Sequence, residues 1–148
     1  MAGYKVTFDR GLVDMLRNGG ERAQSIMRAG TADIAHHFVQ RAVELAGTGP
    51  YGRSFSASPD GDAVVAGSKS PMAGVIEKGR KPGHRPPPAS IRKRRGGSYA
   101  TAARIADRIA ARGTRGRYVV KKANASIRSD GTIDRIARRV VEAVAHGG

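Results

Sequence analysis

The chain has no cysteine and no tryptophan, and only three Phe and four Tyr among its 148 residues. The absence of cysteine excludes disulfide scaffolds, thiolate zinc sites, cysteine nucleophiles and cysteine-ligated iron–sulfur clusters. The small number of aromatic rings argues against binding modes in which several bases stack on aromatic side chains. These absences narrow the candidate functions without selecting one.

Long apolar runs are also missing. No stretch approaches the roughly 18 residues of a membrane-spanning helix, and no apolar segment of a secretory signal follows Met1. We therefore expect a soluble chain that begins near its natural start and has no membrane partner. With 39% apolar residues, the chain can fill one modest core, so we expect a single domain over residues 1–148.

Acidic residues are scarce only in the middle of the chain, where basic residues are concentrated. The formal net charge is +15, and the stretch from Arg80 to Lys122 holds fourteen Lys or Arg against one acid, Asp107. The segments on either side are almost neutral. Such a block attracts nucleic acid, an anionic membrane surface or an acidic protein face, and charge alone does not separate them.

The sequence contains no recognisable constellation for catalysis or metal binding. His36 and His37 are neighbours, so on a helix they point about 100° apart and cannot share a metal ion as residues at i and i+4 would. Asp60-Gly61-Asp62 lacks the later ligands of a calcium loop and is typical of a turn. No phosphate-binding loop or nucleophile elbow is present. We therefore predict no enzyme activity, no catalytic residue, no cofactor and no metal site.

Hydrophobic periodicity predicts an α+β fold with a long N-terminal helix. Apolar residues at helical spacing run from Leu12 to Leu45, with a break near Asn18-Gly19-Gly20. This pattern predicts a short helix followed by a long one that ends near Ala46, with Gly47 just beyond it. Before them, Tyr4–Phe8 alternates apolar and polar residues like a short strand.

The middle of the chain predicts a small antiparallel sheet and then a proline-rich loop. Ser54–Ala57 and Ala63–Ala66 flank a Pro-Asp-Gly turn and predict a β-hairpin. Ser70-Pro71 begins a predicted helix of barely two turns that Gly79 ends. Residues 80–97 contain four prolines and are predicted to form an exposed basic loop or arm, with one turn of helix around Ile91.

Two further helices are predicted toward the C-terminus. Ser98 is a candidate N-cap for a helix that runs to about Arg112 and ends at Gly113. Thr132 is a candidate cap for a last helix with a clear apolar stripe. Between these helices, Tyr118–Val120 is a short apolar segment typical of a strand.

The basic block supplies the candidate contact residues. Four cations follow one another in the predicted loop, and arginines at steps of four share one face of the helix after Ser98. No helix-turn-helix or zinc-finger spacing is present, so contacts with nucleic acid would be made to phosphates. The candidate contacts with nucleic acid or an acidic partner are Arg80, Lys81, Arg85, Arg92, Lys93, Arg94, Arg95, Arg104, Arg108, Arg112, Arg115 and Arg117.

The order of several short motifs resembles the small tail-component proteins of long-tailed bacteriophages. In that family a helix leads into a Pro-x-x-Thr-Gly-x-Leu-x-x-Ser turn, then a strand pair, a Tyr-Ala-x-x-Ile/Val-Glu-x-Gly segment and a Pro-Gly-x-x-Pro-Pro loop. Met72 replaces the tyrosine here, and the leading proline of the turn has moved to Pro50. The matching positions, in order, are Thr48-Gly49, Arg53-Ser54, Ala73, Ile76-Glu77, Gly79, Pro82-Gly83 and Pro86-Pro87.

The resemblance covers about residues 34–91 and implies a non-enzymatic structural protein of the virion. Such neck, head–tail joining, tail-completion or minor tail proteins form homo-oligomeric rings, so we expect a ring, hexameric by the resemblance, that is assembled in the host cytoplasm. Its expected partners are the phage connector or stopper, the tail terminator or tube proteins, and the double-stranded DNA in the channel. Glu77 and Lys78, at the end of the short helix, are candidates for the subunit interface.

Other readings remain open from the sequence. A cellular nucleic-acid-binding protein would use Arg80–Lys122 as an arm that becomes ordered on phosphates, independently of base sequence. A small enzyme with an unrecognised site is a weaker candidate, and the block can also be a solvated surface without a partner. Images of the purified protein distinguish the virion protein from the cellular nucleic-acid-binding protein, because only the virion protein is expected to form rings.

Overall fold

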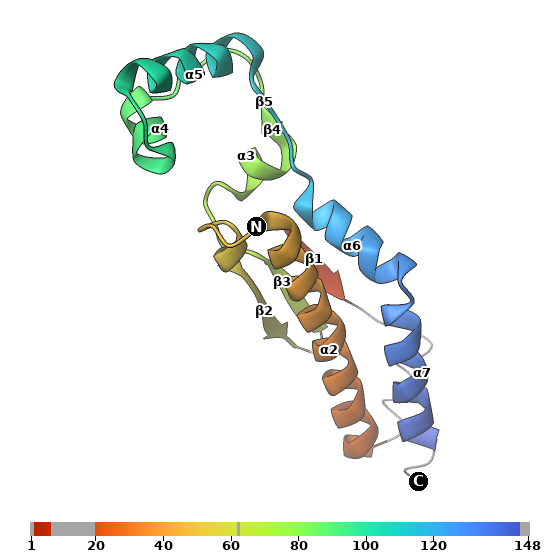
Figure 1. Ribbon diagram of the computed structural model, residues 1–148. Helices are drawn as coiled ribbons and strands as arrows, with labels where there is room; N and C mark the ends of the chain where they lie inside the picture. Colours follow the sequence, from red (N-terminus) through yellow and green to blue (C-terminus); the bar gives the residue numbers. More distant parts are fainter. Residues whose placement is uncertain (1, 7–19, 62, 146–148) are drawn as a thin grey trace. The chain divides into compact units, whose positions relative to one another are not determined.

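The computed structural model describes residues 2–6, 20–61 and 63–145, and it has the α+β fold that the sequence predicts (Figure 1). The short helix expected after Leu12 and the last two residues of the expected first strand lie outside these residues. The elements in chain order are β1 (Ala2–Val6), α2 (Gly20–Ala46), the 3₁₀ helix η1 (Gly52–Ser54), β2 (Phe55–Asp60), β3 (Ala63–Ser68), α3 (Ala73–Lys78), β4 (Gly79–Arg80), α4 (Pro88–Arg95), α5 (Tyr99–Arg112), β5 (Thr114–Arg115), α6 (Val119–Ser129) and α7 (Thr132–Ala145).

These elements group into two compact units. The core unit comprises Met1–Ala73 and Val119–Gly148, and the inserted unit is the continuous segment Gly74–Tyr118. The boundaries of the inserted unit nearly coincide with those of the basic block. The expectation of one domain over residues 1–148 did not anticipate this division.

A three-stranded antiparallel sheet, in the order β1-β3-β2, forms part of the core unit. The predicted hairpin is confirmed: β2 pairs with β3 from Phe55 opposite Ser68 to Asp60 opposite Ala63. Gly61 has a φ of +60°, a left-handed conformation that glycine adopts without steric cost. Because β2 continues through Asp60, the turn is shorter than the sequence predicts.

Helix α2 supplies Phe38, the largest fully buried side chain of the core unit. Its described residues run from Gly20, which has a φ of +74°, to Ala46, where the Gly47 N–H donates to the Val43 carbonyl at 2.8 Å. Leu45, expected on the apolar face, is exposed. The residues of that face that are buried as predicted are Ala23, Met27, Ile34, Phe38 and Ala42.

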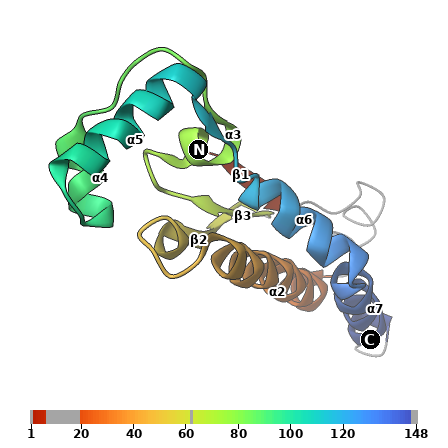
Figure 2. The same ribbon diagram turned by 45° about the horizontal axis from the view of Figure 1, so that its top comes forward.

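Helix α6 corrects the prediction of a strand at Tyr118–Val120. Residues 119–129 are helical, and Val119, Ala123 and Ile127 are buried at steps of four along one face. This spacing is typical of a helix. The prediction of a strand rests on the three neighbouring apolar residues 118–120 and does not take the wider spacing into account. Figures 1 and 2 show that α6 and α7 lie beside α2. Helix α2 contacts both of them and also contacts β2 and β3.

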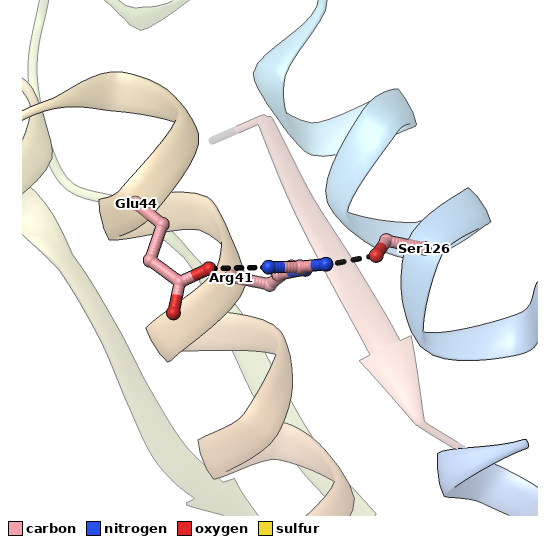
Figure 3. A network of polar contacts seen from close by, with 3 residues as sticks. All are labelled: Arg41, Glu44 and Ser126. Carbon is pink, nitrogen blue, oxygen red and sulfur yellow. Dashed lines mark hydrogen bonds and ion pairs between the residues drawn. The ribbon is translucent and has the colours of Figure 1, made fainter. Parts of the chain in front are cut away.

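A polar contact joins α2 to α6 at the surface (Figure 3). The Arg41 guanidinium donates from Nη1 to Glu44 on its own helix at 2.6 Å and from Nε to the Ser126 hydroxyl at 2.8 Å. The hydrogen bond to Glu44 is the main reason that the pKa of Arg41 lies above its ordinary value. Because the side chains are exposed, the contact adds orientation between the helices more than stability.

The inserted unit contains most of α3, a two-stranded ribbon and a pair of helices. Helix α3 begins at Ala73, later than predicted, because Ser70 first forms a turn in which its carbonyl accepts from the Ala73 N–H at 3.0 Å. The ribbon pairs β4 with β5, Gly79 opposite Arg115 and Arg80 opposite Thr114. Helices α4 and α5 lie side by side in both ribbon views.

The proline run marks the start of a helix. The sequence predicts one turn around Ile91, whereas α4 covers eight residues with Pro88 in its first turn and Pro87 as its N-cap. Proline suits this position because the first N–H groups of a helix have no intrahelical acceptor. The next helix confirms its predicted ends: the Ser98 hydroxyl accepts from the Thr101 N–H at 3.1 Å, and α5 ends before Gly113.

Gly30 permits the close approach of α2 and α7. A Cβ at this position would overlap with Cγ2 of Val140, a stiff, buried side chain on α7. Helix propensity alone favours Gly30→Ala by about 1 kcal/mol. We nevertheless expect Gly30→Ala to lower the free energy of unfolding by about 1–3 kcal/mol, because overpacking opposes the gain in propensity.

Chemical denaturation of Gly30→Ala, Val140→Ala and the double variant measures this effect. The double variant should recover part of the loss, because Val140→Ala removes the overlapping methyl group. If the two effects simply add, or if Gly30→Ala is stabilising, the assigned packing of α2 against α7 is wrong.

Asp130 provides a pH-dependent contact at the start of α7. Its Oδ1 accepts from the Thr132 N–H at 2.9 Å, and hydrogen bonding by Thr132 holds the pKa of this carboxyl below its ordinary value of 3.8. A lowered pKa means that the contribution is complete above pH 3.8 and is lost as the pH falls through the lowered pKa. We expect Asp130→Ala to lower the melting temperature at pH 7 and to differ less from the parent near pH 2. A difference independent of pH would show that the charge is not involved.

Candidate anion-contacting surface

All twelve predicted contact residues lie in the inserted unit, which has thirteen Lys or Arg against two acids, Glu77 and Asp107. Eleven of the twelve are exposed, and Arg80 in β4 is half-buried. They come from β4, the loop of residues 81–87, the end of α4, α5, β5 and the segment that follows β5. The fold therefore places all twelve candidate contact residues in one compact unit.

Helix α5 carries three of these cations as a rigid row. Arg104, Arg108 and Arg112 are all exposed, whereas Ala102 and Ala106 are buried. At a rise of 1.5 Å per residue, the row spans about 12 Å along the helix axis. Its spacing is thus fixed by regular backbone, as predicted from the sequence.

The run Arg92–Arg95 forms the last turn of α4. Four consecutive helical residues point in directions about 100° apart, so one flat protein surface cannot contact all four. Positive charge at a helix C-terminus also interacts favourably with the helix dipole. The sequence predicts these residues in an exposed basic loop or arm, whereas in the structure they form the end of a helix and point in different directions.

The loop of residues 81–87 is attached to α5 at two points. The Gly83 N–H donates to the Ala110 carbonyl at 2.8 Å, and Arg85 Nε donates to Asp107 Oδ1 at 2.6 Å. This hydrogen bond to Asp107 raises the pKa of Arg85 above its ordinary value. The one exposed acid of the unit thus holds the loop and offsets one of its cations.

Glu77 and Lys78 occupy different environments. Glu77 is 7% exposed, and its carbonyl accepts from the Tyr118 N–H at 3.2 Å, whereas Lys78 is exposed. Their role at a subunit interface stays a prediction, and of the two only Lys78 lies at the surface of the chain.

The residues that carry the family resemblance include ones with a clear structural role. The Ser54 hydroxyl donates to the Tyr51 carbonyl at 2.6 Å and lies 2.7 Å from the hydroxyl of Ser68, which is almost fully buried. These hydrogen bonds hold η1 against the base of the hairpin. Gly79 ends α3 with a φ of +80°. The motif therefore specifies backbone geometry rather than a reactive site.

Across residues 2–6, 20–61 and 63–145, no three His, Asp or Glu side chains are close enough to hold a metal ion. His36 and His37 are both exposed on α2. No helix within the same ranges combines the length and the hydropathy needed to cross a membrane.

Comparisons with protein-family models, curated proteins and solved structures found no match. Two features of the chain bear on its function: the basic surface and the order of the motifs.

Substitution of Asp107 tests whether the inserted unit contacts polyanions. Asp107→Asn frees Arg85 and makes the unit more positive, so we expect tighter binding of duplex DNA at low salt, measured by fluorescence anisotropy. Asp33→Asn is the matched control, because it frees Arg139 in the core unit from an ion pair of the same 2.6 Å length. Equal gains from both substitutions would mean that only net charge matters.

Proposed function

We propose that the chain is a structural virion protein of a tailed bacteriophage, a neck or tail-completion subunit that joins the head connector to the tail in a ring around the DNA channel. The observation that carries the proposal is the order of the matching motifs along the fold. The motifs lie, in chain order, just after α2, in η1, in α3 beyond the hairpin, at the start of β4 and in the loop after β4. Several of these residues set backbone turns, as expected of a family related by architecture rather than by chemistry.

The charge distribution supports a role in which the inserted unit meets a polyanion. In a ring, symmetry repeats this basic unit around the axis, where it adds to a positive field. Such a surface suits the DNA in a channel or the acidic faces of neighbouring neck and tail proteins. The core unit, whose buried residues come mainly from α2, α6 and α7, would position each copy.

Because of this positive charge, we expect ring assembly to depend on ionic strength and on the presence of DNA. Basic units on adjacent copies repel one another unless salt screens them, and the screening length is about 10 Å at 0.1 M ionic strength. Bound DNA has the same effect because it neutralises the cations. We therefore expect rings to form more readily at raised salt or with short duplex DNA than at low salt without DNA.

Negative-stain images and sedimentation velocity of the purified protein across these conditions test the proposal. Closed rings of uniform size, about six subunits by the family resemblance, are the expected result. A protein that remains monomeric in every condition yet binds DNA would contradict it. That outcome would favour a cellular protein that contacts phosphates independently of base sequence.

A further inference from the structure

The inserted unit has a surface hollow on one side of its ribbon. It has a volume of about 470 Å³ and is lined by Gly74 and Val75 of α3, by Thr114 of β5 and by three cations, Lys78, Arg80 and Lys81. This volume falls within the range of roughly 300–1,000 Å³ that is usual for small-ligand sites. We call it the cationic hollow.

No carboxylate lines the cationic hollow. Glu77, although next to Lys78 in sequence, is buried and is not among the lining residues, and Asp107 is paired with Arg85. The carbonyls of Ile76 and Glu77, near the negative end of α3, accept hydrogen bonds from the N–H groups of Arg117 and Tyr118. Three positive charges therefore share this hollow with no acid in its lining.

The backbone around the hollow is held in place by close packing. A Cβ at Gly79 would overlap with the carbonyl oxygen of Thr114, and one at Gly113 would overlap with that of Arg80. Both glycines also have positive φ. Only glycine fits at these two positions, because the backbones of the two strands approach closely there. The pairing of β4 with β5 therefore fixes the backbone positions of Arg80 and Thr114 without a ligand. A site prepared in this way loses little freedom on binding.

The composition of the hollow favours a phosphate group over a carboxylate. A phosphate monoester carries close to two negative charges and three strong acceptor oxygens, whereas a carboxylate carries one charge and two oxygens. The hollow offers a guanidinium, which can donate two parallel hydrogen bonds, together with two ammonium groups and a hydroxyl. Three cations around one carboxylate would leave most of the charge uncompensated. They can be neutralised by one phosphate monoester, or by successive phosphodiesters of a nucleic-acid backbone, each of which carries one negative charge.

We propose that the cationic hollow binds a phosphate group, supplied by a nucleic-acid backbone or by a free phosphate compound. This assignment gives Lys78 a phosphate-binding role in addition to its expected place at a subunit interface. It holds for a virion protein and for a cellular one, so the absence of rings would leave it standing.

Inorganic phosphate and a short duplex DNA, each titrated into the full chain at constant ionic strength, test the proposal. The hollow variant is Lys78→Gln/Arg80→Gln/Lys81→Gln. The matched control is Arg92→Gln/Lys93→Gln/Arg94→Gln, which removes the same charge from the same unit but outside the hollow. Amide shifts in NMR spectra locate the site, and circular dichroism checks that both variants are folded.

We expect saturable phosphate binding that shifts the amides of residues 74–81 and 114. The hollow variant should weaken phosphate binding at least tenfold and the control less than twofold. With DNA, the hollow variant should also reduce the salt slope by about 0.9 for each phosphate contact that is lost. Binding of DNA at the hollow without binding of free phosphate would support the proposal and identify a phosphodiester as the source.

Equal weakening of phosphate binding by the two variants would overturn the proposal, because it would show a diffuse field rather than a site. Displacement of phosphate by a glutamate-rich peptide at equal concentration would also overturn it and indicate an acidic protein partner. If the triple hollow variant is unfolded, Lys78→Gln alone, at an exposed position, takes its place and is expected to weaken phosphate binding severalfold. No change with that variant would contradict the assignment.

Discussion

Repulsion among the cations of Gly74–Tyr118 is the constraint on which the arrangement of the inserted unit depends. Thirteen Lys or Arg and two acids share 45 residues, and the buried apolar side chains of α5 are only alanines. So little apolar burial contributes modestly to stability. Backbone contacts also hold the unit together. They are the β4–β5 pairing, the hydrogen bonds to the end of α3, and the close approaches at glycines where a Cβ would overlap with a carbonyl. The charged side chains are left at the surface.

This arrangement separates two tasks along the chain. The core unit buries Phe38, Ile34 and Ile127 and has mixed charges at its surface, including the Arg139–Asp33 and Arg41–Glu44 pairs. The inserted unit has little core but a concentrated charge. A fold of this type can keep its architecture while its basic surface meets a phosphate backbone or an acidic neighbour. The proposed place in a phage neck uses both parts, one to build a ring and the other to contact the channel or adjacent proteins.

Much of the fold is predictable from local signals. Gly47, Ser98 and Gly113 mark helix ends by capping and turn chemistry, and the hairpin follows from its Pro-Asp-Gly turn. Helix α6 is not anticipated, because its three buried residues are spread over nine positions among basic ones. The contact residues follow from charge, but the cationic hollow depends on the pairing of β4 with β5, which brings Thr114 beside Arg80. Two-residue strands have no periodicity from which such pairing could be read.

The central claim is that the inserted unit, rather than the whole basic protein, contacts polyanions. Backbone amide chemical shifts of the full chain, followed during titration with a short duplex DNA at low salt, test it most directly. The account predicts shifts concentrated in residues 74–118, independent of the DNA sequence and reversed by salt. Shifts spread evenly over the core unit, or confined to its α7 surface, would contradict it.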